Sequence, residues 1–214
     1  MQLKTSDGVN IAYDWYPAKT PAGYLVLVHM MPATKESWKE FAEAVQKENF
    51  SSIAIDLRGH GQSDAGPQGY NAFADEEHQQ SIKDLEAALD FLKTQGAESE
   101  KITLAGASVG SNLCIWYLSE HPEIKSAVAL SAGESYRGIH ILPMLAKLQS
   151  DQKLLMFASE DDVRSGGSNA SVNKRLIEAV PEGVGRELAV FATGGHGTDF
   201  LPQATAKILE FLKS

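Results

Sequence analysis

Ser108 lies between two glycines in the segment Gly106-Ala-Ser-Val-Gly110, a spacing typical of a catalytic nucleophile. An apolar run typical of a strand, residues 102–105, precedes the segment, and a run typical of a helix, residues 112–118, follows it. A turn this sharp strains the central residue and exposes its hydroxyl, and the two glycines let the strand and helix approach closely. We therefore interpret Ser108 as a nucleophile for acyl transfer. The alternative is a small-residue turn that only packs a helix on a strand.

A serine hydroxyl is a weak nucleophile and needs a base, itself oriented by a third group. His196 is the predicted base, because Thr193-Gly-Gly-His-Gly-Thr198 follows the predicted last strand, residues 188–191, and its glycines favour a loop that reaches the sheet edge. The acid is expected just after the preceding strand, residues 154–158, where Glu160, Asp161 and Asp162 stand in a row. Periodicity does not separate these three carboxylates.

Acyl transfer also requires two preorganised donors for the oxyanion. The first is predicted to be the backbone N–H of Val109, which opens a helix and so has an unpaired amide. The second is assigned to the backbone N–H of Met30, in the loop His29-Met-Met-Pro32 that follows a predicted strand. We interpret His29 as a structural residue that fixes this loop.

The elements that must position these residues alternate along the chain. Short runs that are apolar on both faces, typical of parallel strands, alternate with amphipathic helical patterns. The predicted strands are 23–29, 52–56, 101–106, 126–131, 153–158 and 186–191, and an antiparallel hairpin of 2–5 and 10–16 precedes them. The predicted fold class is α/β, with about eight mostly parallel strands and helices on both faces. We expect one domain over residues 1–214.

Composition narrows the function classes. A net charge of −9 disfavours nucleic-acid binding, and no run approaches the ~18 apolar residues of a membrane span. The first residues do not resemble a signal peptide, so the expected location is the cytoplasm. The single cysteine, Cys114, allows neither an intrachain disulfide nor a cysteine metal cluster, and no spacing resembles a metal site. We expect no cofactor and no metal.

The chain resembles the α/β-hydrolase superfamily, on the esterase, lipase and thioesterase side. Beside the Ser108 turn, Asp56-Leu-Arg-Gly-His-Gly-Gln-Ser63 is similar to the family's D-x-R-G-x-G-x-S loop. The family's acid closes a G-x-x-D stretch, and Ser159-Glu-Asp-Asp162 is similar to it with Ser in place of Gly. The resemblance implies a triad of Ser108, Asp162 and His196, with Asp161 in reserve. Where the family usually has Gly after the oxyanion-loop histidine, this chain has Met30.

The segment between Ser131 and Lys153 is too short for the multi-helix cap of many relatives. We expect a minimal lid and an open pocket, which disfavours long lipid substrates. Met31, Ile141 and Leu142 are the predicted substrate-binding residues. The alternative for the apolar stretch 139–145 is a short helix that covers the core.

The leading hypothesis is a serine carboxylesterase-type hydrolase that acts on small-molecule esters or thioesters through an acyl-enzyme. The alternative hypothesis is a ligand receptor of the same fold that keeps the triad but turns over slowly or not at all. An aspartate-nucleophile dehalogenase or epoxide hydrolase is disfavoured, because the turn carries serine.

Overall fold

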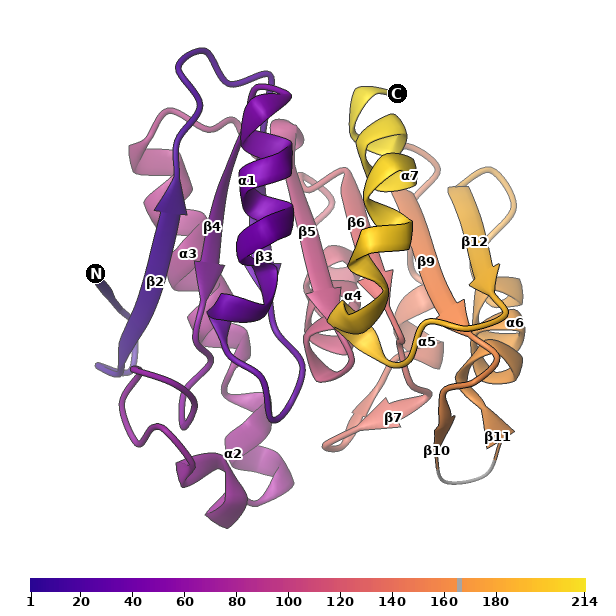
Figure 1. Ribbon diagram of the computed structural model, residues 1–214, viewed down its shortest axis with the longest axis horizontal. Helices are drawn as coiled ribbons and strands as arrows, with labels where there is room; N and C mark the ends of the chain where they lie inside the picture. Colours follow the sequence, from indigo (N-terminus) through magenta and orange to yellow (C-terminus); the bar gives the residue numbers. More distant parts are fainter. Residues whose placement is uncertain (165–166) are drawn as a thin grey trace.

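The computed structural model describes residues 1–164 and 167–214 and contains an eight-stranded sheet at its centre (Figure 1). The strand order is β1-β2-β4-β3-β5-β6-β9-β12. Strands β3, β4, β5, β6, β9 and β12 pair in parallel, whereas β2 runs antiparallel to β4 and to β1. The predicted mostly parallel sheet with an N-terminal antiparallel edge is confirmed. The strands are Gln2–Lys4 (β1), Asn10–Tyr16 (β2), Gly23–Val28 (β3), Phe50–Ile55 (β4), Ile102–Ala107 (β5), Ser126–Leu130 (β6), Lys153–Ser159 (β9) and Gly185–Phe191 (β12).

Helices cover both faces of the sheet, because successive side chains of each central strand point to opposite faces. Leu25 and Leu27 of β3 pack with α1 (Lys39–Lys47) and α7 (Leu201–Lys213), the two helices at the front of Figure 1. Val26 and Val28 pack on the other face. The helices there are α3 (Ile82–Thr94), α4 (Val109–Glu120), α5 (Leu142–Leu145) and α6 (Asn169–Glu178).

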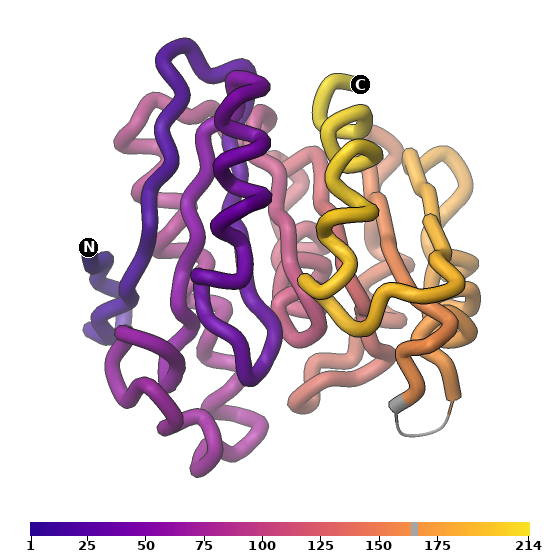
Figure 2. The backbone as a smooth tube through the Cα atoms, in the orientation of Figure 1, coloured from indigo at the N-terminus to yellow at the C-terminus, as the bar shows by residue number. Residues whose placement is uncertain are grey.

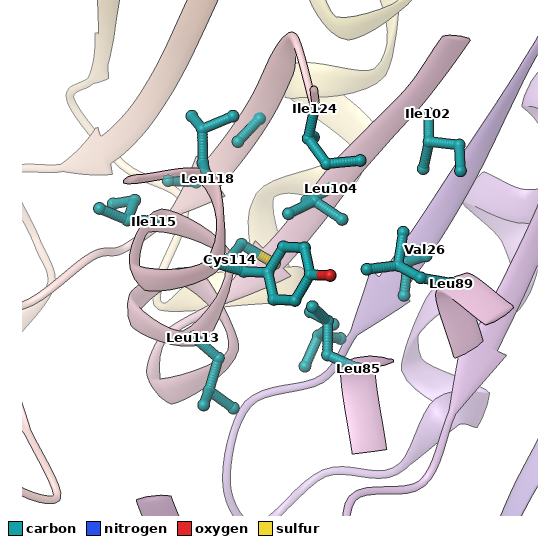
Figure 3. Close-up of a cluster of buried hydrophobic side chains, with 14 of the residues drawn as sticks. Val26, Leu85, Leu89, Ile102, Leu104, Leu113, Cys114, Ile115, Leu118 and Ile124 are labelled. Atoms are coloured by element: carbon teal, nitrogen blue, oxygen red, sulfur yellow. The ribbon is translucent and has the colours of Figure 1, made fainter. Parts of the chain in front are cut away.

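The larger of the two core clusters lies between the sheet and helices α3 and α4 (Figure 3). Leu85 and Leu89 of α3 approach Val26 of β3, and Cys114 of α4 lies among these apolar side chains. Helix α4 is apolar around nearly its whole circumference, with nine buried residues named among its twelve. A helix of this composition is stable only when it is buried, so the backbone just after Ser108 is held firmly against the sheet.

The carboxyl ends of the parallel strands meet at one edge, the lower edge of Figures 1 and 2. Open α/β sheets bind ligands at this edge. Smaller elements lie there that the sequence patterns did not predict: helix α2 (Asp75–Gln79) and the two-stranded ribbons β7–β8 (Ser135–Tyr136, Ile139–His140) and β10–β11 (Val163–Arg164, Gly167–Ser168). Four short 3₁₀ helices complete the described elements: η1 (Lys35–Trp38), η2 (Gly69–Ala72), η3 (Ser99–Lys101) and η4 (Gly197–Phe200).

Within the two described stretches, none of the helices combines the length and apolar character required to cross a bilayer.

Candidate active site

Ser108 occupies the turn between β5 and α4, as the sequence predicts. Its backbone is strained, with φ 53° and ψ −117°, and β5 ends one residue before it while α4 begins one residue after it. The Ser108 N–H donates to the carbonyl of Leu130, at the end of the neighbouring strand β6, at 2.8 Å. The turn is therefore anchored to the neighbouring strand at Ser108 itself.

The two glycines that flank Ser108 are required by close packing. A Cβ at Gly106 would overlap the carbonyl of Gly110, and a Cβ at Gly110 would overlap the carbonyl of Val28. Strand β5, the first turn of α4 and the end of β3 thus meet here backbone to backbone. Only residues without a side chain allow this approach.

His196 and Asp162 meet in a buried pair. The Nδ1 atom of His196 lies 2.6 Å from an Oδ2 atom of Asp162, and each residue is 4% exposed. An ionised carboxylate only accepts hydrogen bonds, so Nδ1 carries the proton and donates it to Asp162. The tautomer that results leaves Nε2 with a free lone pair, which is the state a general base requires.

Asp161, the other candidate acid, has a different set of partners. Its carboxylate accepts the backbone N–H groups of Gly194 and Gly195, both within 3.2 Å, and the hydroxyl of Ser159. The bond from Ser159 and then those from the two amides hold the pKa of Asp161 below its usual value. Asp161 therefore fastens the loop that carries His196, whereas Asp162 contacts the imidazole itself.

The histidine loop reaches the nucleophile turn through Gly197. A Cβ on Gly197 would lie 3.4 Å from the Cβ of Ala107 and 2.6 Å from the sulfur of Met30. The residue after His196 is therefore in contact range of the residue before Ser108 and of the predicted oxyanion loop. Figures 1 and 2 show how the chain leaves the end of β12 and runs along this edge before α7 begins.

Ser131 is a positioning residue that the sequence patterns did not reveal. It has a positive φ of 54° directly after β6, is fully buried, and its hydroxyl accepts the Gly197 N–H at 2.9 Å. A serine after a strand has no distinctive sequence signal, because the partner of its hydroxyl, the Gly197 N–H, lies 66 residues further along the chain.

The predicted oxyanion donors lie on the two expected elements. Val109 is the first residue of α4, where a helix leaves its backbone N–H groups without intrahelical acceptors. Met30 follows β3, and its carbonyl is 2.9 Å from Nδ1 of His29. The Leu57 N–H donates to Nε2 of His29 at 3.0 Å, so Nδ1 must carry the proton that reaches Met30. Burial lowers the pKa of His29 to about 3, so this loop is fixed by a neutral imidazole.

The three predicted substrate-binding residues lie in different environments. Met31 is half-buried against the larger core cluster, and Leu142 is 44% exposed. Ile141 has no exposed surface and belongs to the core, so the structure corrects its assignment to a pocket wall. Ile141 directly follows the ribbon β7–β8, and its backbone N–H donates to the carbonyl of Glu134 at 3.2 Å. For Ile141 the structure matches the core-covering interpretation of the stretch 139–145.

A cleft of about 480 Å³ lies beside the histidine loop. Its lining includes Thr198 and Asp199 of η4 together with Glu36 and Glu40, but neither Ser108, Asp162 nor His196. Its carboxylates and its lack of the reactive side chains separate it from the site of chemistry.

The loop 56–63, which is similar to the family's D-x-R-G-x-G-x-S loop, supports the structure around it. Asp56 is buried, and its two carboxylate oxygens accept the N–H groups of Lys35 and Gln62 at 2.8 and 2.9 Å. Ser63 donates to the Asp56 carbonyl at 2.6 Å. The buried carboxylate thus joins the start of η1 to this loop.

Comparisons with known proteins agree with the geometry. The model of a family described as "alpha/beta hydrolase fold" matches residues 23–172. The chain is 29% identical over 168 residues to the bifunctional esterase/perhydrolase DCH of Acinetobacter calcoaceticus, which covers 76% of this chain and 52% of that protein. It is 32% identical over 133 residues to the non-heme chloroperoxidase CPO-A1 of Kitasatospora aureofaciens, and the match covers 60% of this chain and 42% of that protein.

Among solved structures, the esterase EaEST from Exiguobacterium antarcticum superposes with a TM-score of 0.77 at 17% identity, over 100% of this chain and 99% of that one. The chain spans about half the length of the curated relatives that it matches. The family model covers well over half of the chain, from the strand before the oxyanion loop to the helix after Asp162. This chain belongs to the α/β-hydrolase fold family.

Proposed function

We propose that this protein is a serine hydrolase that cleaves carboxylic esters or thioesters of small to medium substrates through an acyl-enzyme. The observation that carries the proposal is the 2.6 Å contact between His196 Nδ1 and Asp162, made by a loop whose Gly197 lies within contact range of the residue before Ser108. The Acinetobacter relative and the Exiguobacterium neighbour both carry esterase in their names, which supports the same reaction class.

In the first half of the reaction, Nε2 of His196 accepts the Ser108 proton as the hydroxyl oxygen attacks the substrate carbonyl. The backbone N–H groups of Val109 and Met30 stabilise the oxyanion. His196 then gives the proton to the leaving alcohol or thiol as the bond from the carbonyl carbon to that group breaks. The products at this stage are the free alcohol and an ester between Ser108 and the acyl group.

In the second half, water attacks the acyl-enzyme and His196 accepts one of its protons. The tetrahedral intermediate collapses with return of that proton to the Ser108 oxygen, which releases the carboxylic acid. Asp162 stays ionised throughout and stabilises the imidazolium formed in each half.

Besides the ester or thioester, this chemistry requires only water, and it needs no cofactor. The short lid, reduced to the ribbon β7–β8 and helix α5, favours small to medium esters.

The test combines labelling and turnover. We expect a fluorophosphonate probe to label the wild-type protein at Ser108 and to leave Ser108→Ala unlabelled. Wild-type protein should hydrolyse p-nitrophenyl esters of short acids, and Ser108→Ala should lose at least 10⁴-fold in kcat with an unchanged circular-dichroism spectrum. Activity retained by Ser108→Ala would refute the assignment. Labelling with no turnover on an ester and thioester panel would favour the ligand-receptor alternative.

A further inference from the structure

We propose that Tyr136, on the lid ribbon β7–β8, determines which alcohol group the enzyme accepts and favours esters whose alcohol carries an aromatic ring. The inference rests on the proposed ester hydrolysis. Its first support is geometric: the Tyr136 ring lies 6.5 Å from the His196 imidazole between centroids, edge to face at 85°. No other lid side chain has a ring contact with His196 among the described residues.

The position of this ring relative to the reaction identifies the part of the substrate that it meets. His196 returns its proton to the leaving oxygen, so the alcohol portion of the ester lies beside the imidazole. The oxyanion lies on the other side of the carbonyl carbon, toward Val109 and Met30. A side chain that stands against the imidazole is therefore closer to the alcohol than to the oxyanion.

Helix α4 anchors the ribbon that carries Tyr136. Asn112, fully buried on α4 four residues after Ser108, donates to the carbonyls of Gly133 and Ile139 at 2.9 and 3.0 Å and accepts the Gly133 N–H at 3.2 Å. These bonds tie the chain just before β7 and the first residue of β8 to the helix that follows Ser108. Tyr136 is therefore held in place relative to Ser108.

The tip of the ribbon is anchored as well. Its two-residue turn, Arg137–Gly138, has positive φ at both residues, 50° and 73°, the pattern of a tight type I′ hairpin. Gln79 of α2 donates to the Arg137 carbonyl at 3.2 Å. The lid is thus a short ribbon supported at its base and its tip, which favours a fixed wall over a mobile flap.

The ring itself rests on Gly133. A Cβ at this position would overlap the Tyr136 ring, so any larger residue must push the ring away. Tyr136 as a whole is half-buried. An aromatic alcohol placed 4.5–7 Å from such a ring gains an interaction that corresponds to about two- to tenfold in an equilibrium or rate constant.

Two isomeric esters separate the alcohol side from the acyl side. Benzyl acetate carries its ring on the alcohol, whereas methyl phenylacetate carries it on the acyl group, and ethyl acetate is the reference without a ring. The value of kcat/KM for each ester is measured with wild type, Tyr136→Ala, Tyr136→Phe and the control Ser135→Ala, an exposed neighbour on the same strand.

We expect Tyr136→Ala to lower the ratio of kcat/KM for benzyl acetate to that for ethyl acetate by about three- to tenfold. The ratio for methyl phenylacetate should stay within about twofold, and Tyr136→Phe and Ser135→Ala should match wild type. Gly133→Ala should lower the benzyl acetate ratio in the wild-type background but not in the Tyr136→Ala background, because the displaced ring is then absent.

An equal loss on all three esters, a loss confined to methyl phenylacetate, or a loss in Tyr136→Phe as large as in Tyr136→Ala would each overturn the inference. In those cases ester hydrolysis by wild type still stands. If wild type hydrolyses p-nitrophenyl esters but none of these three esters, the inference alone is overturned. If wild type is also inactive on p-nitrophenyl esters and thioesters, the proposed function fails and the inference fails with it.

Discussion

The backbone N–H of Gly197 donates a 2.9 Å hydrogen bond to the hydroxyl of Ser131, which joins the histidine loop to the end of β6. The preceding residue, Leu130, accepts the N–H of Ser108 at 2.8 Å. The last residue of β6 and the residue after it therefore hold the Ser108 turn and the His196 loop. Their separation is set by the rigid backbone of the sheet rather than by flexible side chains.

This relationship predicts the effect of removing one hydroxyl. Ser131→Ala takes away the acceptor of the Gly197 N–H, so His196 should lose part of its alignment. We expect kcat for a p-nitrophenyl ester to fall about ten- to a hundredfold with little change in KM, since small misplacements of catalytic groups have effects of this size. The unfolding free energy should fall by about 1 to 2 kcal/mol in urea titrations.

Ser52→Ala provides the matched control for Ser131→Ala. Ser52 is also fully buried, but its hydroxyl finds no hydrogen-bond partner among the described residues, and it lies on β4. Its kcat should stay within about twofold of wild type. If both variants lose the same activity, the Ser131 hydroxyl has no particular role in positioning His196.

The acid assignment separates two neighbouring carboxylates. Asp162→Asn removes the charge that faces Nδ1 of His196, so the imidazole is neither held in its tautomer nor stabilised as an imidazolium. We expect kcat to fall by about 10⁴-fold, as for the corresponding change in other serine triads. Asp161→Asn weakens the bonds that this carboxylate accepts from the Ser159 hydroxyl and from the Gly194 and Gly195 amides, none of which involves the imidazole, and should reduce kcat by about tenfold or less. The reverse order of the two variants would transfer the role to Asp161.

The sequence predicted the elements with the strongest local signals. The apolar runs, the small residues around Ser108 and the glycines around His196 report strands, the turn and the loop directly, because those features depend on near neighbours in the chain. The confirmed sheet shifts strand boundaries by one or two residues, for example to Phe50–Ile55 where 52–56 was predicted.

The missed features depend on contacts between distant residues. The ribbon β7–β8 has only two residues in each strand and owes its place to Asn112 and Gln79, which lie in other elements. Ile141 was assigned to a pocket because its neighbours are apolar, but apolar character alone does not distinguish a pocket wall from a core position. Ser131, which accepts the Gly197 N–H, and Tyr136, whose ring contacts His196, carry no pattern that a single sequence reveals.

The close approach at the nucleophile turn predicts a large penalty for one methyl group. Gly110→Ala places a Cβ against the carbonyl of Val28, where the obstacle is backbone and has little freedom to move. We expect a loss of about 3 kcal/mol or more in unfolding free energy, at or above the upper end of usual overpacking costs, and a loss of probe labelling at Ser108.

Gly185→Ala is the control for that penalty. Its Cβ would meet the side chain of Lys153 at 3.4 Å and the carbonyl of Gln152 at 3.7 Å, both ordinary van der Waals distances. The unfolding free energy of this variant should change by less than about 1 kcal/mol. Equal stability of the two variants would contradict the packing argument.

Buried neutral histidines predict a loss of stability in mild acid. His60 stacks on Tyr70 and is 2% exposed. Burial, and then the charges of His78 and Arg137, lower its pKa to about 4. The hydrogen bond between its Nδ1 and the Arg58 carbonyl raises the pKa but does not offset burial. The unfolded chain takes up a proton at this residue below about pH 6.5, but the folded chain does not until near pH 4. The contribution of His60 is therefore complete above pH 6.5 and is lost as the pH falls toward 4. From pH 7 to pH 5 this loss is about 2 kcal/mol.

Urea titrations of wild type and His60→Asn at both pH values isolate the contribution of His60, because the other groups titrate alike in both proteins. These groups include Asp84, whose raised pKa acts in the opposite direction. The variant should lose about 2 kcal/mol less than wild type over this range, and equal losses would mean that His60 is already charged in the folded protein at pH 5.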